Sequence, residues 1–404
     1  MPQLLTPHYY SAFRCVGADC PEHCCRGWTI ALDKTTYNRY LDHPAPEIGG
    51  ITRAHVKKVK KSTQHWAEAA LDDTGNCRFL DGQGLCNVHK LAGPEMLSTT
   101  CTTYPRSEVQ FADQIKRSLK LSCPEACRLI LFDPNAMQLS AEAYTGRAAS
   151  QVVTDKLLTL QGAFVELLTR GGASAEQVLF FAGMMVHKAG ALDEAALLQF
   201  CGQTLALAAE PGPVFGQLPY LPRVHWLALA QLIKPFNTMR TERSQRGSAV
   251  IGECVEWLHQ LFDGDFDEAR VDTLYNSYFT HVKPFFDAHP QLLAHYLFYQ
   301  VLDDNFPAAQ KADHIGRYQL LVADFFMLRT LLTARAALKG GLSEADVVAV
   351  FYSYHARRQH NARFRQAVAG LLGNAKLAQD IAMYALLVTP DSPAAGQAGA
   401  PQPA

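Results

Sequence analysis

The sequence lacks an excess of either charge. Lysine and arginine number 37, aspartate and glutamate number 38, and the formal net charge over 404 residues is −1 at pH 7. Binding to the nucleic-acid backbone favours a basic surplus, so we expect no nucleic-acid partner. A long apolar run is also missing, because the most apolar stretch, residues 320–332, contains Asp324 and Arg329. It is too short to cross a bilayer of about 30 Å, so we expect no membrane partner.

Several common enzyme signatures are absent as well. Their absence removes the usual support for nucleotide, dinucleotide, zinc-protease and serine-hydrolase functions. The missing patterns are a Walker loop, Gly-x-Gly-x-x-Gly after a strand, His-Glu-x-x-His and Gly-x-Ser-x-Gly. Any chemistry is therefore expected near the one unusual feature of the chain, its cysteines.

Nine of the eleven cysteines lie in the first third of the chain. Residues 1–7 have neither a charged n-region nor an apolar h-region, so we expect a reducing cytoplasmic location rather than a disulfide framework. Thiolates are soft ligands that suit zinc or iron–sulfur iron, and their density predicts a metal centre. Cys201 and Cys254 stand apart in apolar surroundings and are predicted to be core residues.

The spacing does not decide between zinc and an iron–sulfur cluster. Position 27 is glycine, so a Cys-x3-Cys-x2-Cys loop is absent, and paired Cys-x2-Cys hooks are absent too. The one two-residue spacer separates Cys86 from His89, which could form a Cys/His pair or leave His89 as a loop histidine. Both metals remain open at this point.

The pattern of the chain changes near residue 135. Before it, turn signals at residues 72–76 and 81–84 predict irregular, loop-rich structure. After it, helical signals dominate, including the capping patterns Ser174-x-x-Gln177 and Ser343-x-x-Asp346. The fold class is therefore predicted to be mainly α: a Cys-rich metal-binding region over 1–135, a helical substrate- or cofactor-docking domain over 136–388, and a disordered tail over 389–404. One face of a further helix is expected to hold Leu321, Phe325, Leu328 and Leu332.

Six segments of the first third form a distinctive set. They are Thr6-Pro-His-Tyr-Tyr-Ser-Ala-Phe-Arg-Cys15, Cys20-Pro-Glu-His-Cys-Cys-Arg-Gly-Trp28, Asp33-x3-Tyr37, Cys77-x8-Cys86, Cys101-Thr-Thr-Tyr-Pro-Arg106 and Ser118-Leu-Lys-Leu-Ser-Cys-Pro-Glu-Ala126. In order and spacing they resemble the FliB family of flagellin lysine N-methylases, strongly over residues 6–131 and loosely over the rest. The Cys-rich part is also similar to a broader group of iron- or zinc-chelating proteins.

The resemblance implies methyl transfer from S-adenosylmethionine to lysine side chains of flagellin, by a protein that carries a [4Fe–4S] cluster. The ligand candidates that it implies are Cys15, Cys20, Cys24, Cys25, Cys77, Cys86, Cys101 and Cys123. Eight thiols exceed the four that one such cluster needs, so a second metal or other roles for some thiols stay open. Cys127 stands outside the family pattern.

A substrate lysine must lose its ammonium proton before it can accept a methyl group. Tyr104 and Glu125 are the candidate catalytic acceptors, with Asp33 as a further one, and Arg106 is the candidate for holding the carboxylate of S-adenosylmethionine. The alternative is a non-enzymatic iron- or zinc-binding or electron-transfer module that shares only the cysteine framework.

Overall fold

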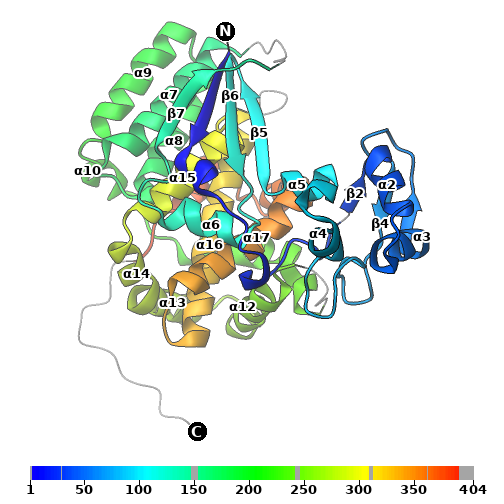
Figure 1. The fold of residues 1–404 in the computed structure, drawn as a ribbon. Coiled ribbons are helices and arrows are strands. Elements are labelled where there is room, and N and C mark those ends of the chain that lie inside the picture. The colour runs from blue at the N-terminus through cyan, green and yellow to red at the C-terminus, as the bar shows by residue number, and fades with distance from the viewer. Residues whose placement is uncertain are drawn as a thin grey trace.

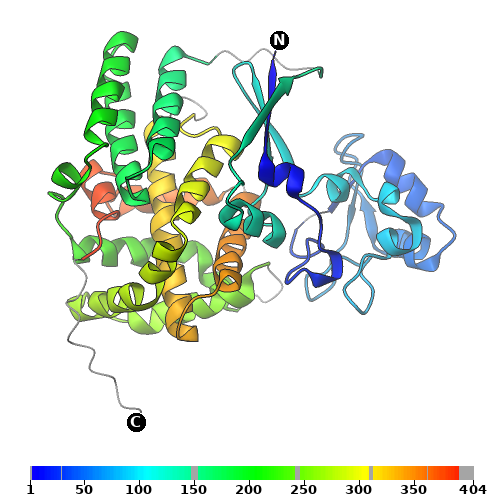
Figure 2. The ribbon, with the colours of Figure 1, turned by 60° about the vertical axis from the view of Figure 1, so that its left-hand side comes forward.

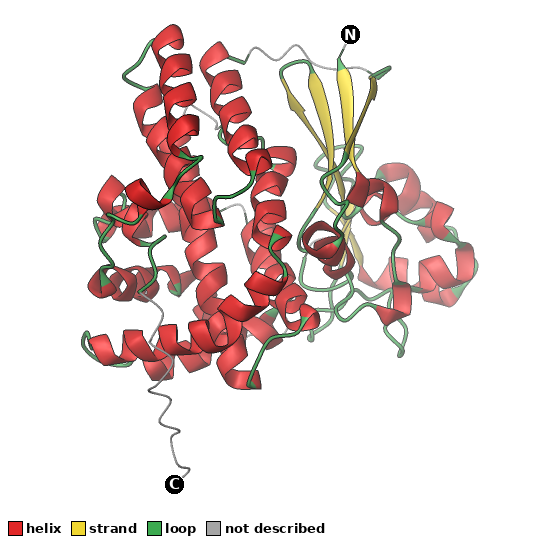
Figure 3. Ribbon diagram, turned by 90° about the vertical axis from the view of Figure 1, so that its left-hand side faces the viewer, coloured by secondary structure: helices red, strands yellow, loops and turns green. Residues whose placement is uncertain are grey.

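The chain folds into a large helical body and a small lobe. The computed structural model describes residues 2–28, 30–146, 153–241, 246–308, 313–361 and 363–390. The small lobe, residues 30–103, stands to one side of the body, and a four-stranded sheet lies beside the helices of the body (Figures 1, 2 and 3). The bridging segment, residues 14–28, connects the first strand and helix to the small lobe. All but two residues of the predicted disordered tail lie outside the described residues.

The four-stranded sheet joins the beginning of the chain to strands far along it. The first strand pairs in parallel with β6, in the register Gln3 to Gln114, and antiparallel with β7, in the register Gln3 to Ala143. The small lobe is therefore an insertion between strands of one sheet. In spatial order the strands are β5 (Arg106–Phe111), β6 (Gln114–Leu119), β1 (Gln3–Pro7) and β7 (Leu139–Ala143).

The small lobe has its own hydrophobic core. Side chains such as Ile30, Tyr40 and Phe79 are buried in it and do not belong to the core of the body. Its sheet has the order β2 (Ile30–Leu32), β4 (Ala67–Ala69), β3 (Val56–Lys58). Its helices are α2 (Lys34–Leu41), η2 (Pro46–Gly50), α3 (Ile51–His55), α4 (Asn87–Ala92), η3 (Pro94–Met96) and α5 (Thr99–Thr103).

The body is built around one long buried helix, α16. This helix packs against α8, α12, α13, α17 and α18. The helical elements outside the small lobe are α1 (His8–Ala12), η1 (Gly17–Asp19), α6 (Pro124–Phe132), α7 (Asp155–Arg170), α8 (Ala175–Ala189), α9 (Glu194–Leu207), α10 (Gly212–Phe215), α11 (Pro222–Leu232), η4 (Lys234–Arg240), α12 (Ser248–Leu261), α13 (Glu268–Ser277), η5 (Tyr278–Val282), α14 (Lys283–Ala288), α15 (Gln291–Asp303), α16 (His314–Lys339), α17 (Glu344–His360), α18 (Phe364–Asn374) and α19 (Asp380–Ala385).

The local helix predictions are confirmed. Ser174 and Ser343 each form a full capping box at the start of α8 and α17. The predicted apolar face of α16 is buried, and so are Cys201 and Cys254. A helix that is buried on every side belongs to the centre of a large core, which is where α16 lies.

The mainly α fold class is also confirmed, although the first third is more regular than predicted. It contains two sheets, and its strands β5 and β6 and helix α6 pack with the body. The division into domains at residue 135 stays a prediction. Strand β7 comes after this residue and pairs with β1, which comes before it. Among the described residues, no helix combines the length and apolarity needed to cross a membrane.

Candidate functional site

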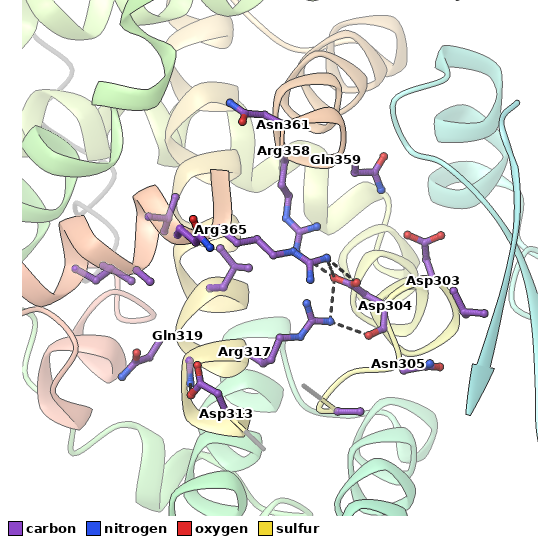
Figure 4. Close-up of a pocket in the computed structure, with 18 of the residues that line it drawn as sticks. Asp303, Asp304, Asn305, Asp313, Arg317, Gln319, Arg358, Gln359, Asn361 and Arg365 are labelled. Atoms are coloured by element: carbon purple, nitrogen blue, oxygen red, sulfur yellow. Dashed lines mark hydrogen bonds and ion pairs between the residues drawn. The ribbon is translucent and has the colours of Figure 1, made fainter. Parts of the chain in front are cut away.

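A polar pocket of about 880 Å³ opens between β5 and four helices of the body, α15, α16, α17 and α18. Its walls come from β5, Lys120 after β6, the end of α15, the start of α16, the end of α17, and α18 (Figure 4). A volume of this size is typical of sites for small molecules and cofactors. Polar residues at the C-terminal ends of the largely buried helices α15 and α17 form part of its wall.

Asp304 is the centre of the pocket's charge network. Figure 4 shows three arginines that approach its carboxylate from different helices. Arg365 Nη2 lies 2.7 and 3.0 Å from its two oxygens, Arg317 Nη2 lies 3.0 Å from Oδ2, and Arg358 Nη2 lies 3.6 Å from Oδ2. Burial raises the pKa of Asp304, but the three guanidinium groups outweigh it and hold this pKa well below its usual range.

Neighbouring polar groups in the wall are paired with one another. Lys120 Nζ lies 2.8 Å from Asp303 Oδ1, and the hydroxyl of Ser107 donates to the same oxygen at 3.0 Å. On the far side of Arg358, its Nε pairs with the buried Asp324. These contacts fix the wall in place, because a buried charge is stable only when it is paired.

Two other wall residues keep buried polar atoms without a partner in the described structure. They are Nε and Nη1 of Arg317 and Oδ1 of Asn305. The Arg317 side chain is only 11% exposed, so these N–H groups have little access to bulk water. Buried polar atoms are nearly always hydrogen-bonded, so unpaired ones that line a pocket indicate a ligand or ordered water.

A chain of hydrogen bonds runs beside the pocket and contains Tyr104. Arg246 Nη1 donates to the Tyr104 oxygen at 2.9 Å, the Tyr104 and Ser122 hydroxyls lie 3.1 Å apart, and Ser122 Oγ lies 2.8 Å from His360 Nε2. Since a guanidinium only donates, the Tyr104 hydroxyl is left to donate to Ser122, and Ser122 to an unprotonated His360. Burial raises the pKa of Tyr104 to about 12, and burial together with the Arg246 and Lys120 charges lowers that of His360 to about 4.

This hydrogen-bond chain borders the pocket. Gln359 lines the pocket, and its side-chain oxygen accepts the backbone N–H of Ser122 at 3.2 Å. The ring of Trp28 packs on the other side, 5.5 Å from that of Tyr104 and 5.7 Å from that of His360. Tyr104, predicted as a catalytic residue, therefore lies where the bridging segment, the small lobe's end and the body meet.

Five cysteine thiols lie close enough for the charge of one to affect another. They come from the bridging segment, from two loops and from α5, and they are Cys24, Cys25, Cys77, Cys86 and Cys101. A hydrogen bond from Cys25 lowers the pKa of Cys24 to about 7, whereas burial raises that of Cys77 to about 12. All five are free thiols.

Two of these thiols are presented by loops of the same design. In each loop the side chain of an aspartate accepts hydrogen bonds from the backbone N–H groups two and four residues later. A glycine with positive φ lies three residues after the aspartate, and the cysteine lies five residues after it. Asp72 thus accepts from Thr74 and Asn76 before Cys77, and Asp81 accepts from Gln83 and Leu85 before Cys86. The predicted turns are confirmed, and the nine-residue repeat of Asp-x-x-Gly-x-Cys is a feature that the sequence analysis missed.

The predicted metal-binding character of this region is not confirmed by the geometry. Among the residues that the structure describes, no three His, Cys, Asp or Glu side chains are arranged so that they could hold a metal ion. The donor chemistry does fit a metal centre, because several free thiols of this region are partly or fully buried and thiolate is the ligand that zinc and iron–sulfur clusters prefer. His89 lies exposed on α4.

The remaining candidate thiols lie toward the body. Cys15 and Cys20 belong to the bridging segment, and Cys20 lies near Cys123 at the start of α6. Cys127, which stood outside the predicted ligand set, is fully buried in the core of the body. Next to Cys20, the carboxylate of Glu22 accepts the backbone N–H of Gly247 at 2.8 and 3.0 Å, which ties the bridging segment to the start of α12.

Two other predicted site residues lie away from the pocket. Glu125 forms a bidentate pair with Arg128, at 2.7 and 2.9 Å. Arg106 is exposed, with its guanidinium over the rings of Phe13 and Tyr10. Side chains alternate along a strand, and on β5 it is Ser107 and Val109 that face the pocket.

Asp33, the further acceptor candidate, caps a helix. Its side chain accepts from the backbone N–H of Thr36 at 2.9 Å and from the Thr36 hydroxyl at 2.6 Å, at the start of α2. This is the ordinary contact of an N-cap aspartate.

Comparison with known sequences places this site in a family. The FliB lysine N-methylase C-terminal domain matches residues 163–386, just over half of the 404 residues. The chain belongs to the FliB lysine N-methylase family. The resemblance seen in the cysteine-rich third is thereby confirmed, and the matched region contains most of the pocket wall.

Two relatives of this FliB-family chain match it over nearly its whole length. Lysine-N-methylases from Salmonella choleraesuis (strain SC-B67) and Salmonella typhimurium (strain LT2) are each 27% identical over an alignment of 394 residues, and the match covers 94% of this chain and 98% of theirs. The flagellar biosynthetic protein FliU of Salmonella muenchen is 41% identical over 134 residues, 33% of this chain and 79% of its own. No solved structure matches the chain.

Sequence reasoning missed most residues that surround Tyr104 in this FliB-family protein. Arg246 and His360 come from parts of the chain that no motif links to Tyr104, although Ser122 and Trp28 stand in segments that carried the resemblance. The pocket left one signal: runs of polar residues, such as 303–305 and 358–361, stand at the C-terminal ends of helices that are otherwise largely buried.

Proposed function

We propose that this protein transfers methyl groups from S-adenosylmethionine to lysine side chains of flagellin. The observation that carries the proposal is the match, over nearly the full length of both chains, to two proteins named lysine-N-methylase. The flagellar target is supported by the family name and by the similarity to a flagellar biosynthetic protein. A pocket of cofactor size beside the hydrogen-bonded Tyr104 is consistent with such chemistry.

The reaction requires a neutral lysine amine. Its lone pair forms the new N–C bond as the S–C bond of the donor breaks and leaves its electron pair on sulfur. S-adenosylmethionine supplies the methyl group on a positively charged sulfur. Because a free lysine has a pKa of about 10.4, the protein must offer a route for the ammonium proton.

Tyr104, Ser122 and His360 provide that route in this proposal. The phenol is protonated at neutral pH, so Tyr104 acts as a proton relay. Its oxygen accepts the proton from the lysine while its hydroxyl proton moves to Ser122. Ser122 then donates to His360, which is neutral and has an exposed edge from which the proton can reach water. Glu125 takes no part, since Arg128 occupies both of its oxygens.

A metal centre belongs to the proposal as well. Some of Cys24, Cys25, Cys77, Cys86 and Cys101 would hold a [4Fe–4S] cluster, with zinc as the alternative, because free thiols are the ligands that both prefer. When bound, the metal would cross-link the bridging segment to the two aspartate loops. It would thereby keep Trp28, at the end of the bridging segment, in its position against Tyr104 and His360. Methyl transfer to a neutral amine needs no redox step, so no electron is assigned to it.

The test is an intact-mass spectrum of flagellin after incubation with S-adenosylmethionine and enzyme prepared without oxygen. Added methyl increments support the proposal, and their loss in Cys24→Ala would tie the activity to the thiol group. If metal-loaded protein of wild-type sequence adds no increment, the proposal fails and a binding module without enzyme activity is favoured.

The proton route is tested by the pH dependence of the same assay in Ser122→Ala. We expect the variant to be slow near pH 7 and to approach the wild-type rate above pH 9.5, where more of the lysine is already neutral. Ser118→Ala is the matched control, since Ser118 is also buried on the same chain segment and lies 2.9 Å from the hydroxyl of Tyr9. An equal loss of rate at every pH would show that Ser122 only supports the structure.

A further inference from the structure

We propose that the pocket at Asp304 binds the methyl donor, and that Arg317 takes the carboxylate of the donor's methionine part. This inference rests on the proposed function and adds the place where the donor sits. Three observations support it: the unpaired groups in the pocket wall, the pocket's position beside Tyr104, and the mainly apolar lining of a smaller cavity beside β6.

The unpaired groups match the polar ends of S-adenosylmethionine. Two buried nitrogens of Arg317, Nε and Nη1, have no partner among the described residues, and a guanidinium is the preferred partner of a carboxylate. Asn305 Oδ1 is a buried acceptor without a donor, which suits the donor's amino group or a ribose hydroxyl. Asp304 needs no ligand, because its three arginines already neutralise it.

The position of the pocket also suits a methyl donor. Gln359 lines it and holds the backbone N–H of Ser122, whose hydroxyl belongs to the Tyr104 chain. A donor in the pocket would thus lie next to the residues proposed to receive the lysine proton. Arg106, which the sequence suggested for the carboxylate, points to the opposite face of β5.

A smaller cavity beside β6 is a poor alternative. It measures about 290 Å³, is lined mainly by apolar side chains such as Leu158 and Phe298, and has Lys116 among its lining residues. A cationic sulfonium gains nothing from an apolar wall with a buried amine, and the volume leaves little room for an adenosyl group.

The inference is tested by calorimetric binding of S-adenosylhomocysteine, the demethylated donor, to the full chain. We expect Arg317→Gln to weaken binding tenfold or more, since charged hydrogen bonds are lost. Arg106→Gln is the control and should bind within about twofold of the wild type. 5′-Methylthioadenosine, which has no carboxylate, should bind Arg317→Gln and wild type about equally.

A second variant guards against a folding defect in Arg317→Gln. Ala369 lines the pocket from an exposed position on α18, so Ala369→Trp narrows the pocket without removing an ion pair. We expect it to melt like the wild type and to bind the probe at least tenfold more weakly.

The outcomes separate the two proposals. If wild type binds S-adenosylhomocysteine and both pocket variants bind it equally well, the donor lies elsewhere, while the proposed function stands. If wild type binds neither S-adenosylhomocysteine nor S-adenosylmethionine, the proposed function itself is overturned.

Discussion

At the scale of single residues, Lys116 is a buried amine that has no carboxylate partner within the described part of the chain. It is 2% exposed, and its Nζ donates to Gln161 Oε1 at 2.8 Å and to the carbonyl of Val301 at 3.2 Å. Burial lowers its pKa to about 7. Between pH 7 and about 10 the unfolded chain therefore binds one more proton at this residue than the folded chain.

This difference makes the contribution of Lys116 to stability dependent on pH. The free energy of unfolding should gain up to about 1.4 kcal/mol per pH unit above pH 7 from this group, and nothing below pH 7, where both states are protonated. The variant Lys116→Met lacks this gain. The difference in free energy of unfolding, variant minus wild type, should therefore be largest at pH 7 and below and should fall by up to about 1.4 kcal/mol per pH unit between pH 7 and pH 9. Urea unfolding at pH 6, 7, 8 and 9 measures it, and a constant difference would contradict the pKa.

Individual residues also show what the sequence can and cannot reveal about a site. Tyr104 was predicted from the motif that carries it, but Arg246 and His360 lie 142 and 256 positions further along (246 − 104 and 360 − 104), where no spacing rule connects them. Arg106 was assigned to the donor because its charge is suitable. The alternation of side chains on β5 directs Arg106 away from the pocket. Which side chains of a strand face a given side can be assigned only when the position of the strand in its sheet is known.

At the scale of elements, the paired aspartate loops depend on their glycines. Gly75 has a φ of +83° and Gly84 one of +76°, a region in which a side chain costs about 1–2 kcal/mol. We expect Gly75→Ala to lower the free energy of unfolding by about that amount. Gly82→Ala, where an added Cβ meets no atom within 4 Å, should change it by less than about 0.5 kcal/mol. Equal effects in urea unfolding would argue against the loop geometry.

The helices were the predictable elements, and the sheets were not. Capping boxes and the apolar face of α16 are local patterns, so a window of a few residues reveals them. The first strand, in contrast, finds its partners at residues 114–116 and 139–143, and its five residues carry no distinctive alternation. Long-range pairing of this kind is decided by the whole fold.

At the scale of the whole molecule, Arg246 joins the start of α12 to Tyr104, which follows the small lobe, and to Ser122 ahead of α6. Arg246 is 7% exposed and donates to the Tyr104 oxygen and, at 2.6 Å, to the carbonyl of Ser122. We expect Arg246→Leu to lower the free energy of unfolding by about 1.5–3 kcal/mol, because two charged hydrogen bonds disappear. Hydrogen exchange at the Gly247 amide, which Glu22 protects, should quicken as well.

The control for that prediction is Arg240→Leu. Arg240 forms a surface pair with Glu256, so its loss should cost at most about 1 kcal/mol. If both variants lose the same stability and the Gly247 amide stays protected, Arg246 does not hold these segments together.

The parallel pairing of β1 with β6 also fixes an order of events during synthesis on the ribosome. The first strand emerges before the small lobe but has no partner until residue 114 has been made, and β7 follows later still. The small lobe draws its core from residues 30–101, so it can close while β1 is still single. The thiols of Cys77, Cys86 and Cys101 would then be gathered before the body that holds the pocket exists.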